Sequence, residues 1–266
     1  MIMRIVAIIW VVVILGLMPA QAIRSHRKIQ KVRPSRTQAY IRTMFGLILM
    51  GTITLAIDWL SGGTGIQAAK NLPGSARLGA WAAGTFLTCA VVWFGGILQR
   101  KLSQQPVDEM VALLLPRSTR EQVAFLIVSL FAGSVEEYLM RGFCLLVLAQ
   151  ATGSMAVSFM LVTLGFAVAH GYQGAWAILR TGLLGAILAV PVVVTSTLLP
   201  SMIAHAGTDI LAGAFGYRLL AAGAYWNSVP EPDTLQPSNT LFSRNLQDLF
   251  PRLPPRGETD DGGFDL

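Results

Sequence analysis

Residues 122–150 read QVAFLIVSLFAGSVEEYLMRGFCLLVLAQ, and the only charged side chains among them are Glu136, Glu137 and Arg141. The stretch is longer than the about 20 apolar residues that cross a bilayer as a helix, so we expect one tilted or bent span over 119–150. A charge at the centre of a bilayer costs at least about 2.5–3.5 kcal/mol, so charged residues in spans usually face the bundle interior and mark a functional site. The sequence predicts such a site around residue 136.

Two local signals place the start and the bend of this helix. Ser118 and Glu121 have the spacing of a capping box, which predicts that a helix begins at about residue 119. A bend is expected near Gly133 or Gly142, because sharp kinks in long helices have local causes such as glycine.

The composition of the whole chain fits a membrane protein. Hydrophobic residues make up 53% and charged residues only 13%, which is about half the usual charged share of soluble domains. Further apolar segments of spanning length lie at 5–23, 39–60, 78–99, 155–170, 175–199 and 200–220. We therefore predict an all-α, polytopic transmembrane helical bundle of seven or eight spans with a buried polar chamber.

Three regions follow from the distribution of charge. Residues 1–103 hold the first three spans and a basic loop at 24–38, which the positive-inside rule assigns to the cytoplasm. Residues 104–224 hold the intramembrane charges, and 225–266 form a polar tail that we expect to be disordered. A basic segment beside an apolar span is typical of a juxtamembrane anchor, so we predict no binding to nucleic acid.

The connecting segments carry signals of their own. Residues 61–77, rich in Gly, Ser, Asn and Pro, are predicted to be a loop. Residues 105–116, QPVDEMVALLLP, have Pro106, Asp108 and Glu109 near the start and an apolar row behind them, which predicts a short helix on the cytoplasmic leaflet. Residues 5–23 are similar to a signal peptide, but a leader followed by so many basic residues would translocate poorly, so we expect a retained first helix.

Helical spacing assigns different roles to the two adjacent glutamates. Glu137 and Arg141 are four residues apart with the acid first, the favourable order for an ion pair within a helix. Glu136 is rotated by about 100° from Glu137 and has no local partner. Its carboxylate is therefore the one available as a general base.

Two histidines occur in later apolar segments. Phe166 precedes His170 by four residues and Asp209 follows His205 by four, so each pair shares a helix face. Phe166 can support the His170 ring, and Asp209 can reach the His205 imidazole. A carboxylate, a histidine and a hydrogen-bond donor are the groups that activation of water needs. The strings GxSG and HExxH do not occur, and neither Asp58 nor Asp209 stands in a GxGD context, so the sequence does not indicate a serine, zinc or aspartyl type of intramembrane protease.

Three motifs lie in apolar segments in this order: EExxxR (Glu136, Glu137, Arg141), FxxxH (Phe166, His170) and HxxxN/D (His205, Asp209). Together they resemble the CAAX protease and bacteriocin-processing family, also called Abi-type or glutamic intramembrane endopeptidases. The resemblance covers about residues 104–222, so 104–224 is expected to be the catalytic domain.

The resemblance implies a role for each matched residue. Glu136 is similar to the catalytic glutamate, which activates a water molecule with the histidine that matches His170. His205 is similar to the histidine that stabilises the oxyanion with the residue four positions on. That residue is Asp209 here and asparagine in the best-studied members; either Asp209 is protonated, or it orients a protonated His205. Supporting roles are implied for Glu137, Arg141 and Phe166.

The implied activity is hydrolysis of a peptide bond in a membrane-associated peptide or protein, without a cofactor, in the plasma (inner) membrane of a prokaryote. In one alternative the peptidase is zinc-dependent, with Glu136, His170 and His205 as ligands and one position open for water. In another, the same residues form a proton or ion relay of a non-enzymatic membrane protein, or the chain is an immunity or scaffold partner.

Overall fold

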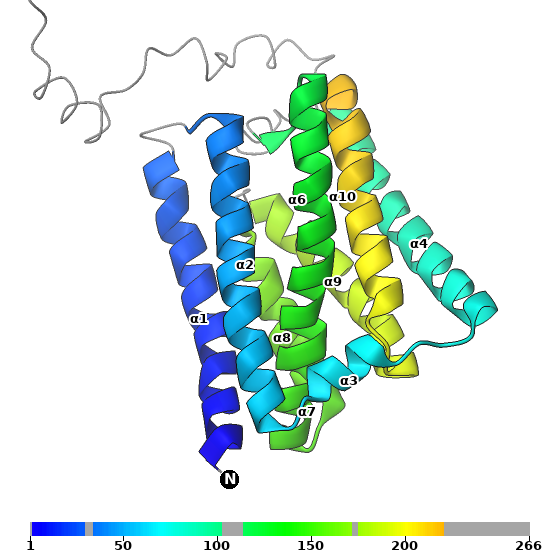
Figure 1. Ribbon diagram of the computed structural model, residues 1–266. Coiled ribbons are helices and arrows are strands. Elements are labelled where there is room, and N and C mark those ends of the chain that lie inside the picture. The colour runs from blue at the N-terminus through cyan, green and yellow to red at the C-terminus, as the bar shows by residue number, and fades with distance from the viewer. Residues whose placement is uncertain (1, 30–33, 103–113, 172–174, 221–266) are drawn as a thin grey trace, which may run out of the picture. The chain divides into compact units, whose positions relative to one another are not determined.

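The computed structural model describes residues 2–29, 34–102, 114–171 and 175–220, and every regular element within these ranges is a helix (Figure 1). Five helical segments are long and apolar enough to cross a membrane: Ile2–Ala20, Arg36–Ser61, Ser75–Gln99, Thr119–Thr152 and Trp176–Thr195. Helices α8, Met155–Ala169, and α10, Leu199–Leu220, lie where the sequence predicted two further spans. The predicted all-α membrane bundle is confirmed.

The first two helices are longer than predicted. Helix α1 covers Ile2–Ile29 and α2 covers Arg36–Ser61, so the connection between them is shorter than the predicted loop at 24–38. Residues 24–29 contain no glycine or proline, so no residue of low helix propensity ends the helix at the predicted boundary. Ser35 then caps α2 and forms a capping box with Gln38.

The segment predicted as a loop at 61–77 contains a short helix, α3, at Thr64–Lys70. This helix was not predicted, because the glycine, serine and proline content of the segment indicates turns. The first backbone N–H groups of this helix find their acceptor in Asp58, near the end of α2. Helix α4, Ser75–Leu102, follows it, while most of the predicted surface helix at 105–116 lies outside the described residues.

The long span that carries VEEYLMRG has three parts. Helix α6, Thr119–Glu137, begins at the predicted capping box of Ser118 and Glu121. It continues into the π-helix η1, Tyr138–Cys144, and then into α7, Leu145–Thr152. The N–H of Leu145 donates to the carbonyl of Met140, five residues earlier, where an α-helix would use the fourth. The irregularity predicted near Gly133 or Gly142 thus takes the form of a π-helix that contains Gly142.

The last three described helices follow one another along the chain with short connections. Helix α8 is followed by α9, Ala175–Thr195, which contains Pro191, and then by α10. In Figure 1, α2 and α6 begin at the end of the bundle where α10 finishes, and α3 lies at the opposite end. The predicted tail at 225–266 lies outside the described residues.

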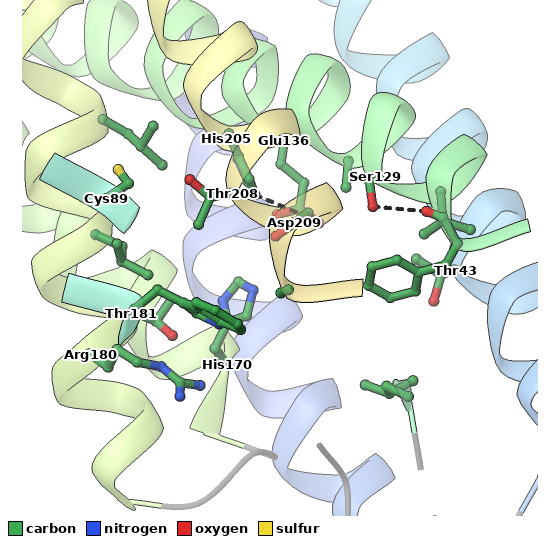
Figure 2. Close-up of a pocket in the computed structure, with 18 of the residues that line it drawn as sticks. Thr43, Cys89, Ser129, Glu136, His170, Arg180, Thr181, His205, Thr208 and Asp209 are labelled. Carbon is green, nitrogen blue, oxygen red and sulfur yellow. Dashed lines mark hydrogen bonds and ion pairs between the residues drawn. The ribbon is translucent and has the colours of Figure 1, made fainter. Parts of the chain in front are cut away.

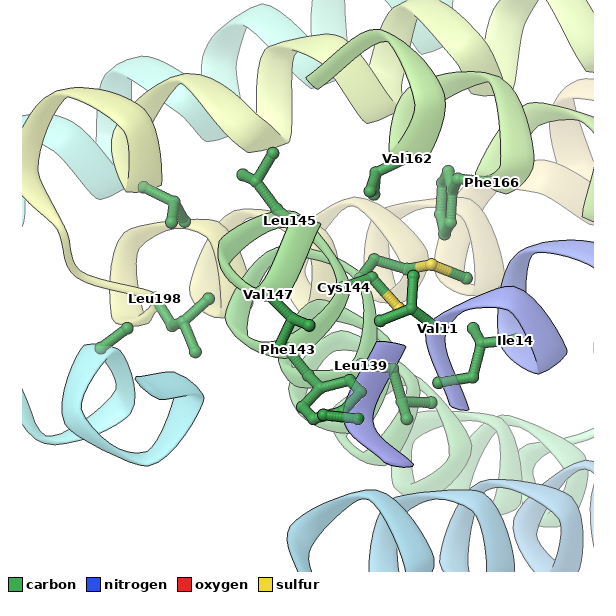
Figure 3. Close-up of a cluster of buried hydrophobic side chains, with 14 residues drawn as sticks. Val11, Ile14, Leu139, Phe143, Cys144, Leu145, Val147, Val162, Phe166 and Leu198 are labelled. Atoms are coloured by element: carbon green, nitrogen blue, oxygen red, sulfur yellow. The ribbon is translucent and has the colours of Figure 1, made fainter. Parts of the chain in front are cut away.

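The largest cluster of buried apolar side chains surrounds the π-helix (Figure 3). Leu139, Phe143 and Cys144 of η1 are fully buried. They pack with side chains from α1, α3, α7, α8, α9 and the turn before α10, including Val11, Ile14, Ala68, Leu145, Val162, Phe166, Val192 and Leu198. The backbone that follows the two glutamates is therefore held by packing on several sides.

Candidate active site

One cavity, with a volume of about 260 Å³, is lined by the four predicted catalytic residues, which come from three separate stretches of chain. Glu136 comes from α6, His170 from the end of α8, and His205 and Asp209 from α10. Figure 2 shows Glu136, His205 and Asp209 grouped together, with His170 nearby. Residues more than 70 positions apart thus line a common space inside the bundle.

The ion pair predicted from helical spacing is present and fully buried. Arg141 donates from Nη1 to Oε1 of Glu137 over 2.9 Å, and neither side chain is more than 1% exposed. The second guanidinium nitrogen, Nη2, donates to the carbonyl of Gly185 on α9 over 2.8 Å. The guanidinium carbon also lies 4.4 Å from the centre of the Phe166 ring, a cation–π contact. Arg141 therefore joins η1 to both α8 and α9.

Glu137 has a second partner that the sequence did not predict. Nδ1 of His205 lies 2.8 Å from the same Oε1 that accepts from Arg141. A carboxylate paired with arginine is an acceptor, so Nδ1 of His205 is the donor and Nε2 is the opposite ring nitrogen. Glu137 thus links the arginine behind the cavity to a histidine that lines it.

His170 is oriented by the residue predicted to support it. Its Nδ1 lies 2.9 Å from the carbonyl oxygen of Phe166, and because a carbonyl only accepts, Nδ1 carries the hydrogen. The Phe166 and His170 rings are 4.6 Å apart between centroids, and the edge of Phe166 meets His205 at 6.3 Å. Phe166 therefore contacts both histidines and fixes which nitrogen of His170 can act as an acceptor.

The two remaining carboxylates of the cavity are less tightly held. Oδ2 of Asp209 lies 3.7 Å from Nε2 of His205, a distance suited to an ion pair but too long for a hydrogen bond. The predicted contact is therefore present, although the shorter contact of His205 is with Glu137. Glu136 makes no hydrogen bond or ion pair with any residue in the described part of the chain. Its carboxylate lines the cavity without a side-chain partner, as the spacing indicated.

Close contact between α6 and α10 explains how Glu137 meets His205. A Cβ at Gly133 would lie 2.6 Å from the backbone nitrogen of Ala206, so only glycine fits there without a shift of the helices. Gly133 is one turn before Glu137, and Ala206 directly follows His205. The glycine contact therefore sets the separation at which these two side chains can bond.

Further side chains line the cavity without belonging to any motif. They include Thr43, Cys89, Ser129, Arg180, Thr181 and Thr208. Within the described ranges, no three His, Cys, Asp or Glu side chains are close enough to form a metal site. The zinc-bound alternative stays a prediction for elemental analysis to test.

Comparison with known families supports the resemblance that the motifs carry. Residues 119–211 match the family model described as type II CAAX prenyl endopeptidase Rce1-like, and the matched segment contains all seven motif residues. Comparisons with curated proteins and with solved structures found no match. This family implies protease activity in an integral membrane protein. Over residues 119–211 the chain is therefore similar to the Rce1-like family of type II CAAX prenyl endopeptidases, which is consistent with the predicted CAAX protease and bacteriocin-processing family.

Proposed function

We propose that this protein is a glutamic intramembrane endopeptidase that hydrolyses a peptide bond of a membrane-associated peptide or protein. The observation that carries the proposal is the environment of Glu136. Its carboxylate has no partner within the described residues, and it lines a cavity that also contains His170 and His205. A charged group in an apolar span is costly, so an unpaired one at a cavity is best explained by chemistry.

In the proposed first step, a water molecule between Glu136 and His170 attacks the carbonyl carbon of the substrate. Glu136 takes one proton of this water as the new C–O bond forms. Because Nδ1–H of His170 donates to the Phe166 carbonyl, Nε2 is the ring nitrogen that carries the lone pair, and in the proposed step it accepts a hydrogen bond from the second hydrogen of the water. His170 in this way orients the attacking oxygen.

His205 is the proposed stabiliser of the oxyanion. With Nδ1–H held by Glu137, a doubly protonated His205 directs Nε2–H at the developing negative charge. Asp209, 3.7 Å from Nε2, supports that charged form of the ring by its own charge. When the C–N bond breaks, the leaving nitrogen takes the proton that Glu136 holds, and the carboxylate is restored.

The substrate is proposed to enter from the end of the bundle where α2 and α6 begin. Tyr40, Leu115 and Phe125, which lie near that end, line the cavity. Arg36, Arg117 and Arg120 lie at the same end, and the positive-inside rule assigns such residues to the cytoplasmic side. A peptide that reaches the membrane from the cytoplasm is the favoured substrate.

The test is cleavage of a library of membrane-associated peptides by protein purified into lipid nanodiscs, analysed by mass spectrometry. Glu136→Gln should lower the rate by about 10²–10⁴-fold, the usual contribution of a general base. Glu258→Gln, far from the motifs in sequence, is the matched control and should leave the rate unchanged. Thermal unfolding of each variant shows that the fold is retained.

A strong chelator and elemental analysis complete the experiment. Cleavage that Glu136→Gln abolishes and the chelator does not affect supports the glutamic mechanism. Loss of cleavage with the chelator, together with stoichiometric zinc, would support the metal-dependent form instead. If wild type and Glu136→Gln are equally inactive across the library, the peptidase proposal fails, and proton flux in the same nanodiscs tests the relay.

A further inference from the structure

We propose that Asp58 is a positioning residue for the candidate active site, acting through Tyr138 on the π-helix that follows the two glutamates. The inference rests on the proposed peptidase function but concerns a residue outside the matched segment 119–211. Asp58 belongs to none of the three motifs and lies near the end of α2.

The carboxylate of Asp58 is fully buried and accepts three hydrogen bonds. Oδ1 accepts from the N–H of Gly65 over 3.3 Å, and Oδ2 accepts from the N–H of Ile66 over 2.8 Å. Oδ2 also accepts from the hydroxyl of Tyr138 over 2.6 Å. One side chain thus joins α2, the first turn of α3 and the first residue of η1.

Tyr138 connects this carboxylate to the site. It directly follows Glu137, and its backbone N–H donates to the carbonyls of both Ser134 and Val135. Two adjacent residues of one turn are therefore each held by other elements. Arg141 and His205 bond to the side chain of Glu137. Asp58 bonds to the side chain of Tyr138. Because the backbone turn is shared, loss of the Tyr138 anchor should change the direction in which the Glu136 side chain points.

Helix α3 and η1 pack so closely that a change in the position of Asp58 would also move the backbone of η1. A Cβ at Gly65 would lie 2.9 Å from both Oδ2 of Asp58 and the carbonyl oxygen of Gly142. Backbone therefore packs directly on backbone at the π-helix, which has the less regular hydrogen bonding.

Helix α3 also contacts the turn that leads to the helix of His205. The N–H of Leu198 donates to the carbonyl of Ala68 over 3.2 Å. The side-chain amide of Asn71 donates to the carbonyls of Thr195 and Ser196 over 3.3 Å and 3.0 Å. Because α10 begins directly after this turn, α3 braces both the glutamate helix and the His205 helix.

Tyr138→Phe tests the proposal, because it removes one hydroxyl and keeps the ring. The expected result is a fall in kcat of about 10- to 100-fold, the cost of a small misplacement of catalytic groups, with KM unchanged. Asp58→Ala should lower kcat further, and Asp58→Asn should restore part of it, because its amide oxygen can still accept. All rates are measured in nanodiscs well below the Tm of each variant.

Thr54→Val is the matched control on the same helix face, one turn before Asp58. It removes the 2.8 Å hydrogen bond from Trp10 Nε1 to Thr54, which joins α1 to α2 and does not involve η1. It should lower Tm without changing kcat. If Tyr138→Phe behaves in the same way as Thr54→Val, Asp58 is a structural residue only and the proposal is overturned.

Hydrogen exchange separates this proposal from the proposed function. The amides of residues 134–145 should exchange faster in Tyr138→Phe than in wild type, and at the wild-type rate in Thr54→Val. That result supports the positioning contact even in a protein that cleaves no peptide. Unchanged exchange in Tyr138→Phe overturns it even if wild type is an active peptidase.

Discussion

Glu137 and Asp58 are both fully buried carboxylates in apolar spans, yet they are satisfied in different ways. Glu137 has charged or chargeable partners, Arg141 and His205, at the wall of the cavity. Asp58 has only neutral donors, two backbone N–H groups and the hydroxyl of Tyr138. The first arrangement balances the carboxylate charge with a positive partner next to the cavity, and the second holds the carboxylate by hydrogen bonds alone while it fixes the backbone of α3 and η1.

The kind of partner determines how much stability is lost when one partner of each carboxylate is removed. Removal of one member of a buried ion pair leaves an uncompensated charge and costs about 3–5 kcal/mol. Removal of one neutral donor from a carboxylate that keeps two others costs about 1.5–3 kcal/mol. The two clusters should therefore respond differently to single substitutions.

The largest effect is expected for Arg141→Met. This change leaves Glu137 buried with His205 as its remaining partner, and stability should fall by about 3–5 kcal/mol. Tyr138→Phe, which removes one neutral donor from Asp58, should lose less. Thermal and denaturant unfolding in the same detergent compare the two variants, and equal losses would contradict the distinction between charged and neutral clusters.

Gly133→Ala should disturb the charged cluster from outside it. The new methyl group meets the Ala206 backbone, so α6 and α10 must separate, at a cost of about 1–3 kcal/mol. The hydrogen bond from His205 to Glu137 should lengthen, and peptide cleavage should fall more than stability alone explains.

Gly46→Ala is the control for this change, because a Cβ at Gly46 has no atom within 4 Å. It should leave stability unchanged or raise it by up to about 1 kcal/mol, the difference in helix propensity. If Gly133→Ala retains full activity, the glycine contact does not set the distance between Glu137 and His205.

The smallest effect is expected at Asp209, which is held more loosely than either buried carboxylate. Asp209→Asn loses the ion pair with His205 but keeps the shape and supplies an N–H that can donate to an oxyanion, so the two effects should offset each other and kcat should stay close to that of wild type. Asp209→Ala removes the group and should lower kcat by about fivefold, because one ion-pair contact at this distance contributes about 1 kcal/mol. A large loss in Asp209→Asn would show that the negative charge itself is required.

Sequence reasoning succeeded where the interacting residues lie within one helical turn. The capping box of Ser118 and Glu121, the Glu137–Arg141 pair and the Phe166–His170 contact are all separated by three or four residues. Periodicity fixes such neighbours before the fold is known. The positions of the spans were likewise predictable, because hydrophobic length alone determines them.

Contacts between distant segments were not predictable in the same way. His205 is 68 residues from Glu137, and Tyr138 is 80 residues from Asp58, so no spacing rule connects them. Helix α3 was predicted as a loop from the Gly, Ser, Asn and Pro content of its segment, and the acceptor for its first N–H groups, Asp58, belongs to the preceding helix. The residue content of 138–144 does not distinguish a π-helix from an α-helix.

The π-helix changes the direction of side chains between the two α-helical parts of its long span, α6 and α7. Each residue turns an α-helix by about 100°, and a turn closed over five residues adds one residue to the count. Side chains of α7 therefore point about 100° away from the direction that an unbroken α-helix from Thr119 would give them. Deletion of one residue within 138–144 would rotate α7 relative to Glu136 and turn its buried face toward lipid, so the length of this segment matters as much as its composition.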